Sequence, residues 1–463
     1  MHREIAAVLC GLLLLALPAT SPAQPRKDHC VILVSVDGLA GFYLDDPRAE
    51  MPTLRRLASE GARAGGLLCS FPTVTWPNHT TLVTGVEPKR HGVIGNNYLD
   101  RASGESVPLI PDPLFDKDQL VKVPTIYDAA HQAGLVTAGI VWPATRNART
   151  LDYTVPDMFD DGWQKYGTQS WLAELRAEGL PVDKHGGWTR QSGGGELRDT
   201  LYTQMAAQVL QKHAPNLLLI HLVEVDHIEH RNGPRSLEAY RAVKFADDRL
   251  RELTEAIERS PSKGKTTLIV ASDHGFFPID KDIRPNVLLK QAGLIQMEGD
   301  RIAKKAAWCQ PQGGACMVYV LDKGRTSEVA EQLAKQFAAV EGVDAVLRPS
   351  EFARVGQATA DEDPRAPDLW LSAKSGYSFT ETHNGADVVA PRSTHGGTHG
   401  YLPDQEEMLG TLVIWGAGVE PGAQILRARN IDVAPTIARL LGVELRGTDG
   451  KVLQSVLRLK QSD

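Results

Sequence analysis

The sequence has few of the features that mark specialised classes of protein. Only 5 of its 463 residues are cysteine, and no internal repeat or low-complexity tract is present. After an apolar run over Ala6–Leu17, no stretch reaches the roughly 18 residues that a membrane-spanning helix needs. Positive charge is not in excess, because the formal net charge is −7. These absences argue against a membrane span in the mature protein and against stable nucleic acid binding.

The N-terminus has the layout of a secretory signal peptide. A charged start is followed by the short apolar run and then by small residues that end at Ala23. We predict that residues 1–23 are removed and that the mature chain, 24–463, is periplasmic or secreted. In an oxidising compartment disulfides are allowed. Cys309 and Cys316 flank a Gly-Gly turn that favours a bridge between them, whereas a Cys30–Cys69 bridge is less favoured.

Short, wholly apolar runs alternate with helical patterns along the chain. Such runs are typical of strands buried on both faces of a parallel sheet. They are Cys30–Val36, Leu135–Val141, Leu217–Val223, Thr267–Ala271 and Leu412–Trp415. The helical patterns are Thr53–Glu60, Pro124–Ala133, Asp199–Lys212, Leu237–Glu258 and Val433–Leu441. The alternation predicts an α/β fold with a mostly parallel, doubly wound sheet flanked by helices.

Two segments interrupt this alternation. Residues from about 145 to 198 are rich in glycine, tryptophan and charge, which predicts a loop-rich insertion. Residues from about 300 to 360 carry a strand pattern at Met317–Leu321, a helical pattern at Ser327–Val340 and a strand pattern at Val343–Leu347. We expect this second segment to form a small α/β cap on the catalytic domain.

Three aspartates follow predicted strands, at Asp37, Asp226 and Asp273. One aspartate after a strand is usually a turn former or a helix cap. Because parallel strands bring their carboxyl ends to one edge of the sheet, three such residues are expected to meet there. The site of chemistry is therefore predicted at this edge.

Histidines accompany these aspartates at the spacing of metal ligands. His230 follows Asp226 by four residues, which puts both on one helix face, and His274 is adjacent to Asp273. Near the C-terminus either His395 or His399 supplies a further imidazole. Carboxylate and imidazole together suit Zn²⁺, with Mn²⁺ as an alternative. Six candidate ligands exceed one tetrahedral site, so two metal ions are predicted.

A nucleophile candidate, Thr75, stands just before a helical pattern that ends near Thr84-Gly85. A hydroxyl at a helix N-terminus lies where backbone N–H groups favour a phosphate. The alternative is that Thr75 or Asn78 only caps that helix. The neighbouring metal-ligand pattern favours the nucleophile.

In this order the motifs resemble those of the nucleotide pyrophosphatase/phosphodiesterases of the alkaline-phosphatase superfamily, over nearly all of the mature chain. They are Asp37, Thr75-Trp76-Pro77-Asn78, Thr84-Gly85, His91-Gly92-Val93-Ile94-Gly95-Asn96, Asp226…His230, Asp273-His274-Gly275 and His399-Gly400-Tyr401. The resemblance implies an alkaline-phosphatase-like fold and a phosphothreonine intermediate on Thr75. One zinc ion would be bound by Asp226, His230 and His399, the second by Asp37, Asp273, His274 and Thr75. It favours His399 over His395 and implies that Asn96 contacts a phosphate oxygen.

The expected substrate is a small phosphate ester or a nucleotide, hydrolysed at a phosphodiester or phosphoanhydride bond. Trp76 stands where the family often has phenylalanine, and with Trp142 it offers a face for a base. Alternatives on the same scaffold are a phosphonoacetate-type C–P hydrolase and a phosphomonoesterase. These need an extra cationic contact, which Lys117 or Lys122 would have to supply. A more remote alternative is a non-catalytic metal-binding protein.

Overall fold

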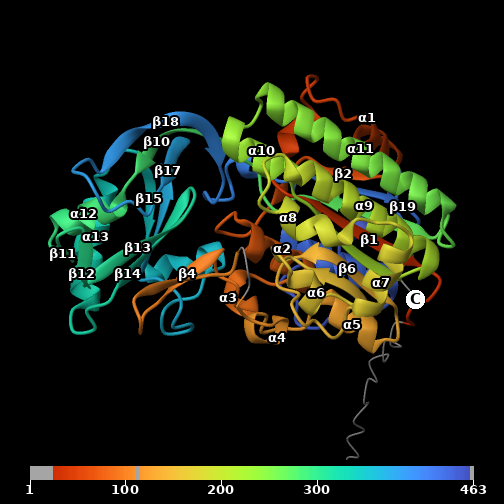
Figure 1. Cartoon of the computed structure of the whole chain (residues 1–463), viewed down its shortest axis with the longest axis horizontal. Helices are drawn as coiled ribbons and strands as arrows, with labels where there is room; N and C mark the ends of the chain where they lie inside the picture. Colours follow the sequence, from red (N-terminus) through yellow and green to blue (C-terminus); the bar gives the residue numbers. More distant parts are fainter. Residues whose placement is uncertain (1–23, 111–113, 459–463) are drawn as a thin grey trace, which may run out of the picture.

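An eight-stranded sheet forms the centre of the larger of two bodies in the computed structural model, which describes residues 24–110 and 114–458 (Figure 1). In order across the sheet the strands are β20 (Ala423–Ile425), β2 (Ala62–Ala64), β19 (Leu412–Gly416), β9 (Thr266–Ala271), β1 (Cys30–Val36), β8 (Leu217–Leu222), β6 (Thr137–Trp142) and β7 (Tyr153–Pro156). The run from β9 to β7 is parallel throughout. The signal peptide predicted over residues 1–23 lies outside the described residues.

β19 departs from the parallel arrangement that its apolar run suggested. It pairs antiparallel with β9 and with β2. An apolar run reports burial on both faces, and a central antiparallel strand is buried in the same way. The sheet is therefore mixed. Its parallel part, from β9 to β7, contains the strands that the predicted site residues follow.

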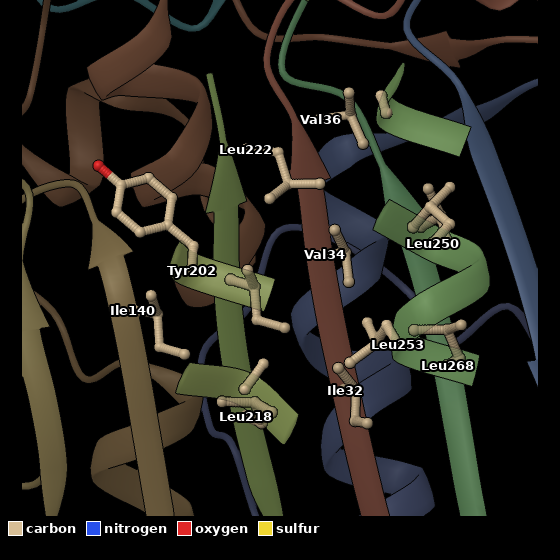
Figure 2. Packing of buried hydrophobic residues seen from close by; sticks show 14 of the residues in the cluster. Ile32, Val34, Val36, Ile140, Tyr202, Leu218, Leu222, Leu250, Leu253 and Leu268 are labelled. Atoms are coloured by element: carbon tan, nitrogen blue, oxygen red, sulfur yellow. The ribbon is translucent and has the colours of Figure 1, made fainter. Parts of the chain in front are cut away.

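Helices cover both faces of the sheet, as the doubly wound prediction requires. On one face Ile32, Val34 and Val36 of β1 pack with side chains of α9 (Gly194–Lys212) and α11 (Leu237–Arg259), as Figure 2 shows. On the other face Val31 and Leu33 share a core with α2 (Thr75–Thr84), α5 (Ile126–Gln132) and α15 (Val433–Leu441). Each aliphatic side chain buried in this way contributes about 1.5–3 kcal/mol to folding. Alternate side chains of β1 thus pack in two separate cores, one on each face of the sheet.

The second body has its own sheets and its own apolar core (Figure 1). A four-stranded antiparallel sheet has the order β13 (Ala307–Gln312), β14 (Ala315–Val320), β16 (Leu369–Ala373) and β15 (Val343–Leu347). A three-stranded sheet has the order β17 (Gly376–Phe379), β10 (Phe277–Ile283) and β18 (Val389–Thr398). The helix expected at Ser327–Val340 is α13 (Thr326–Ala338). The expected cap segment 300–360 lies within the second body, which extends beyond that segment.

Shorter elements complete the chain. The segment 145–198 contains β7, α6 (Gly162–Tyr166), α7 (Gln169–Ala177), α8 (His185–Trp188) and the start of α9. The remaining elements are α1 (Pro52–Glu60), α3 (Pro88–His91), α4 (Lys117–Leu120), α10 (Glu224–Asn232), α12 (Pro285–Gln291), α14 (Pro349–Phe352), β3 (Leu67–Leu68), β4 (Asn97–Asp100), β5 (Glu105–Pro108), β11 (Ile295–Glu298), β12 (Arg301–Lys305) and β21 (Ala428–Arg429). No helix among the described residues has both the length and the apolar character needed to cross a membrane.

The predicted disulfide between Cys309 and Cys316 is not formed. Both are buried free thiols, as are Cys30 and Cys69. In the β13–β14 hairpin Cys309 pairs with Val318, and Cys316 pairs with Pro311. The two cysteines are therefore diagonal neighbours, and such positions lie farther apart than directly opposed ones. The Gly-Gly turn brings the two thiols close enough to interact, but in a diagonal register and without a bond between them.

Candidate metal centre and nucleophile

The three predicted aspartates meet at the carboxyl edge of three neighbouring strands. Asp37 directly follows β1, Asp273 stands two residues after β9, and Asp226 lies in the first turn of α10 after β8. Since β9, β1 and β8 are adjacent and parallel, their ends converge on one place. The prediction of a common edge is confirmed by this strand order.

Helix α10 holds Asp226 and His230 on one face, and a buried carboxylate fixes where the helix begins. Asp199 of α9 accepts the backbone N–H of Val223 at 2.9 Å and that of Glu224 at 3.0 Å, one on each oxygen. These N–H groups belong to a helix start, which otherwise has no partners. One turn later, Asp226 Oδ1 lies 3.3 Å from His230 Nε2. The sequence showed Asp199 only as one polar residue within a helical pattern.

His399 completes a first group with Asp226 and His230, whose ligand atoms all lie within 4.8 Å of one another. The Nε2 atoms of His230 and His399 are 3.2 Å apart, and Asp226 Oδ1 is 3.6 Å from His399 Nε2. Each ring donates its Nδ1–H to a backbone carbonyl, His230 to Gly397 at 3.1 Å and His399 to Thr73 at 2.8 Å. Imidazoles held in this way direct their Nε2 lone pairs toward each other, and a cation between the two Nε2 atoms would accept both.

A second group consists of Asp37, Asp226 and His274, so the Asp226 carboxylate belongs to both groups. His274 Nε2 is 3.2 Å from Asp37 Oδ1 and 3.3 Å from Asp273 Oδ2. A tetrahedral zinc site with bonds of about 2.0–2.1 Å has ligand atoms roughly 3.3 Å apart. The spacings in both groups match that geometry.

Several of these ligand atoms are buried without a hydrogen-bond partner among the residues described. They are Asp37 Oδ1, Asp226 Oδ1, Asp273 Oδ2 and His274 Nε2. An unpartnered buried carboxylate oxygen costs several kcal/mol unless a cation compensates it. Three such oxygens and one imidazole nitrogen in one place are explained by metal ions, and the donor set of carboxylates and imidazoles fits zinc.

The electrostatics of the cluster are those of a site built for positive charge. Burial raises the pKa of Asp273 well above its usual range, and the neighbouring Asp37 carboxylate adds to the rise. Burial alone would also raise the pKa of Asp37, but the hydrogen bond from His221 and the nearby His274 imidazole outweigh it and hold that pKa well below the ordinary value. The carboxylates therefore repel one another and are stabilised only by cations nearby.

The remaining histidines have other roles. His395, the alternative to His399, has a side chain that is 95% exposed, beside Asp280. His227 contacts Arg198 at 3.0 Å, so the i+4 choice of His230 agrees with the geometry. His221 is buried, and its Nε2 donates to Asp37 Oδ2 at 2.8 Å. A histidine that orients a ligating carboxylate has no spacing signal in the sequence, because it comes from within an apolar strand, one residue before the end of β8.

Thr75 is the first residue of α2, and its hydroxyl has no hydrogen-bond partner within the described chain. The N-cap residue of the helix is Val74, whose side chain makes no capping hydrogen bond. Asn78 is occupied elsewhere, because its Nδ2 donates to the carbonyls of Pro72 and Val74. His79 lies between Thr75 and the second group, with its Nδ1 2.9 Å from the Thr75 carbonyl oxygen and 3.4 Å from Asp273 Oδ2. The capping alternative for Thr75 and Asn78 is thus not what the geometry shows.

Asn96 lies beside the start of the same helix. Its Oδ1 accepts the backbone N–H of Trp76 at 2.9 Å. The two tryptophans expected to contact substrate, Trp76 and Trp142, are each only 1% exposed. Trp76 packs in an apolar cluster with Val93, Leu109 and others. A base reaches either ring face only if neighbouring side chains move, so their substrate contacts stay a prediction.

Comparison with known proteins agrees with the site. Residues 31–402 match the type I phosphodiesterase/nucleotide pyrophosphatase family, and the chain belongs to that family. It is 27% identical over 291 residues to an uncharacterized pyrophosphatase/phosphodiesterase of Schizosaccharomyces pombe, covering 61% of this chain and 50% of the relative. It is 26% identical over 250 residues to ectonucleotide pyrophosphatase/phosphodiesterase family member 3 of Rattus norvegicus, covering 53% of this chain and 24% of the relative. The chain thus spans half or less of the length of these two relatives.

Solved structures share the fold. Murine ectonucleotide pyrophosphatase/phosphodiesterase 5 superposes with a TM-score of 0.68 at 20% identity, over 92% of this chain and 100% of that chain. An inactive variant of the murine protein has been solved in complex with AMP, and it superposes with the same TM-score of 0.68. The alkaline-phosphatase-like fold inferred from the motifs is therefore confirmed.

Proposed function

We propose that this chain is a two-zinc hydrolase of phosphodiester or phosphoanhydride bonds that forms a phosphothreonine intermediate on Thr75. The observation that carries the proposal is the convergence of unpartnered ligand atoms from three strand ends beside a helix that starts with an unengaged hydroxyl. Family membership supports the same reaction class. A non-catalytic metal-binding protein would not need the free hydroxyl.

The metal ligands divide between two ions. Asp226, His230 and His399 would hold one, and Asp37, Asp273, His274 and Thr75 the other, with Asp226 close to both. When bound, the ions supply positive charge that lowers the pKa of a hydroxyl and neutralises phosphate oxygens. His221 keeps the Asp37 carboxylate oriented. The three ligand histidines each make a hydrogen bond from Nδ1 to a backbone carbonyl, which fixes the direction of Nε2 in His230, His274 and His399.

The chain's own residues account for the covalent step. The Thr75 hydroxyl loses its proton to solvent, and its oxygen attacks phosphorus in line with the leaving oxygen. The Thr75–phosphorus bond forms as the ester or anhydride bond breaks, and the leaving oxygen takes up a proton from solvent where it needs one. The Asn96 Nδ2 amide is free to donate to a non-bridging oxygen. Water then attacks phosphorus from the opposite side, which breaks the bond to Thr75 and restores its hydroxyl. Positioning and charge neutralisation provide most of the rate.

A preference for diesters over monoesters is the finer part of the proposal. A monoester dianion carries one more negative charge than a diester, and an additional cation near the phosphate would stabilise it. The two lysines considered for that role are engaged elsewhere: Lys117 Nζ donates to Asp128 at 2.7 Å and Lys122 Nζ to Asp363 at 2.9 Å. The engagement of both lysines favours diesters and pyrophosphates over monoesters. The AMP complex of the structural relative favours nucleotides among these substrates.

Rates for an aryl phosphodiester, an aryl monoester and a dinucleotide, measured on the purified zinc-loaded protein, test this assignment. We expect the nucleotide diester to exceed the monoester by at least about tenfold in kcat/KM, since stacking of a base contributes about 1–3 kcal/mol. A monoester or phosphonate preference would move the chain to a neighbouring activity on the same scaffold. Absence of turnover on all phosphate esters would reject the proposal.

Export is the proposed location, with residues 24–463 as the mature enzyme and the second body as a cap on its site. Relatives include a venom phosphodiesterase of Crotalus adamanteus and ecto-enzymes of Rattus norvegicus. N-terminal sequencing of active protein from the cell envelope or the medium tests the proposal. An intact Met1 on the active protein would reject cleavage near Ala23.

A further inference from the structure

We propose that Gln312 is a positioning residue that holds Asn96 in place for phosphate, so that the second body sets the geometry of the site. The inference rests on the proposed function and adds a residue that the motifs do not contain. Gln312 is the last residue of β13 and is buried. Its side chain contacts the loop that carries Asn96, whose flanking residues Ile94 and Leu99 pack in the core of the second body.

The Gln312 amide uses both of its ends on that loop. Its Oε1 accepts the backbone N–H of Asn96 at 2.9 Å, and its Nε2 donates to the carbonyl of Asn97 at 3.0 Å. Nε2 also donates to the Asn97 side chain at 2.5 Å. Gly95 permits this approach, because a Cβ on that residue would stand 2.9 Å from Gln312 Oε1. One side chain thus clamps two consecutive residues of the loop.

With this clamp, three of the four hydrogen-bonding groups of Asn96 are committed to the protein. The N–H bonds to Gln312, the carbonyl accepts from the N–H of Leu109 at 2.9 Å, and Oδ1 accepts from the N–H of Trp76 at 2.9 Å. Only Nδ2 has no partner among the residues that the structure describes. Because Trp76 follows Thr75 directly, the Nδ2 donor is held at a fixed place relative to the nucleophile.

The same hairpin also contacts the metal-ligand segment. The backbone N–H of Gly314 donates to the carbonyl of His399 at 2.7 Å. Gly313 has φ +69°, and a Cβ there would lie 2.3 Å from the His399 carbonyl oxygen. A Cβ on Gly314 would lie 2.4 Å from the ring of Tyr401. The β13–β14 turn is therefore packed between Asn96 and His399, and neither can shift without it.

Replacement of Gln312 by methionine keeps the side-chain volume and removes all three hydrogen bonds of the side chain. Released from the clamp, Asn96 samples other positions, and its donor contributes less to the transition state. We expect Gln312→Met to lower kcat by about 10- to 100-fold, a part of the roughly 100- to 1,000-fold that a single oxyanion donor is worth. KM and zinc content should change little.

A double-mutant cycle with Asn96→Ala separates positioning from a general structural role. If Gln312 acts through Asn96, Gln312→Met lowers kcat less than about threefold in the Asn96→Ala background. Amide hydrogen exchange gives a readout independent of turnover: the peptide that contains Asn96 should exchange faster in Gln312→Met. The matched control is Gln310→Met, since Gln310 is buried on the same strand and its Oε1 has no described partner.

Equal losses from Gln312→Met in the two backgrounds, unchanged exchange at Asn96, or a similar loss in Gln310→Met would overturn the inference. Failure of the proposed function is recognised separately, because it appears as absent turnover in the wild-type protein or as full turnover in Thr75→Ala.

Discussion

The two bodies of the protein contribute to the site in different ways. In the larger body, Asp37, Asp226 and Asp273 stand at the ends of adjacent parallel strands, where the sheet itself determines their position. The second body has a separate core and reaches the site through the end of β18, which leads to His399, and through Gln312. The parallel sheet thus supplies most of the charged groups, whereas the second body fixes where some of them point.

The largest expected effect tests the contribution of the larger body alone. Thr75→Ala should lower kcat by several orders of magnitude while zinc content and the unfolding transition stay close to wild type, because only the attacking oxygen is lost. Thr75→Ser keeps a hydroxyl and should retain part of the activity. Steady-state kinetics with metal analysis on the three proteins measures this. Wild-type rates in Thr75→Ala would mean that Thr75 is not the nucleophile.

Metal binding compares the two bodies directly. We expect about two zinc ions per chain and loss of activity in chelator that added zinc restores. His399→Ala, which removes the second body's ligand, should reduce occupancy of one ion. Asp226→Ala should weaken both, because the Asp226 carboxylate belongs to both ligand groups. Metal analysis after dialysis distinguishes these outcomes, and full activity with one tightly bound ion would contradict the two-site assignment.

Trp76 tests whether a buried side chain next to the nucleophile also binds substrate. Trp76 is 1% exposed within an apolar cluster, so Trp76→Ala should reduce the free energy of unfolding by about 3–5 kcal/mol. If its ring also receives a base, Trp76→Ala weakens kcat/KM for a nucleotide about tenfold more than for a small aryl diester. Trp142→Phe, at the other buried tryptophan, gives the comparison. Equal loss on both substrates would leave Trp76 a packing residue only.

The sequence predicted the metal centre better than the contacts around it, and the reason is physical. Aspartates and histidines at strand ends form a pattern, because parallel strands bring their ends together whatever the rest of the fold. The partner of His221 lies 184 residues away in the sequence, the partners of Asp199 lie 24 or more away, and Asn96 lies 216 residues from Gln312. No local spacing therefore marks these three residues. The antiparallel β19 and the unformed Cys309–Cys316 bridge have a related cause. An apolar run reports burial but not strand direction, and a turn brings two strands together without fixing which residues are opposed.

The smallest expected effect compares two buried aspartates that do the same structural work in different places. Asp199 accepts two backbone N–H groups at the start of α10, and Asp247 accepts those of Thr53 at 2.9 Å and Leu54 at 2.7 Å at the start of α1. Each substitution by alanine leaves two helix-terminal donors without that acceptor and should reduce the free energy of unfolding by about 1–3 kcal/mol. Of these two helices, only α10 carries proposed metal ligands. Asp199→Ala should therefore also weaken zinc retention and lower activity, whereas Asp247→Ala should leave both near wild type at temperatures well below its unfolding transition.

Denaturant unfolding, zinc analysis and kcat on the two variants make the comparison. Equal zinc retention in both would show that the position of Asp226 and His230 is set by the packing of α10 and not by the carboxylate at its start.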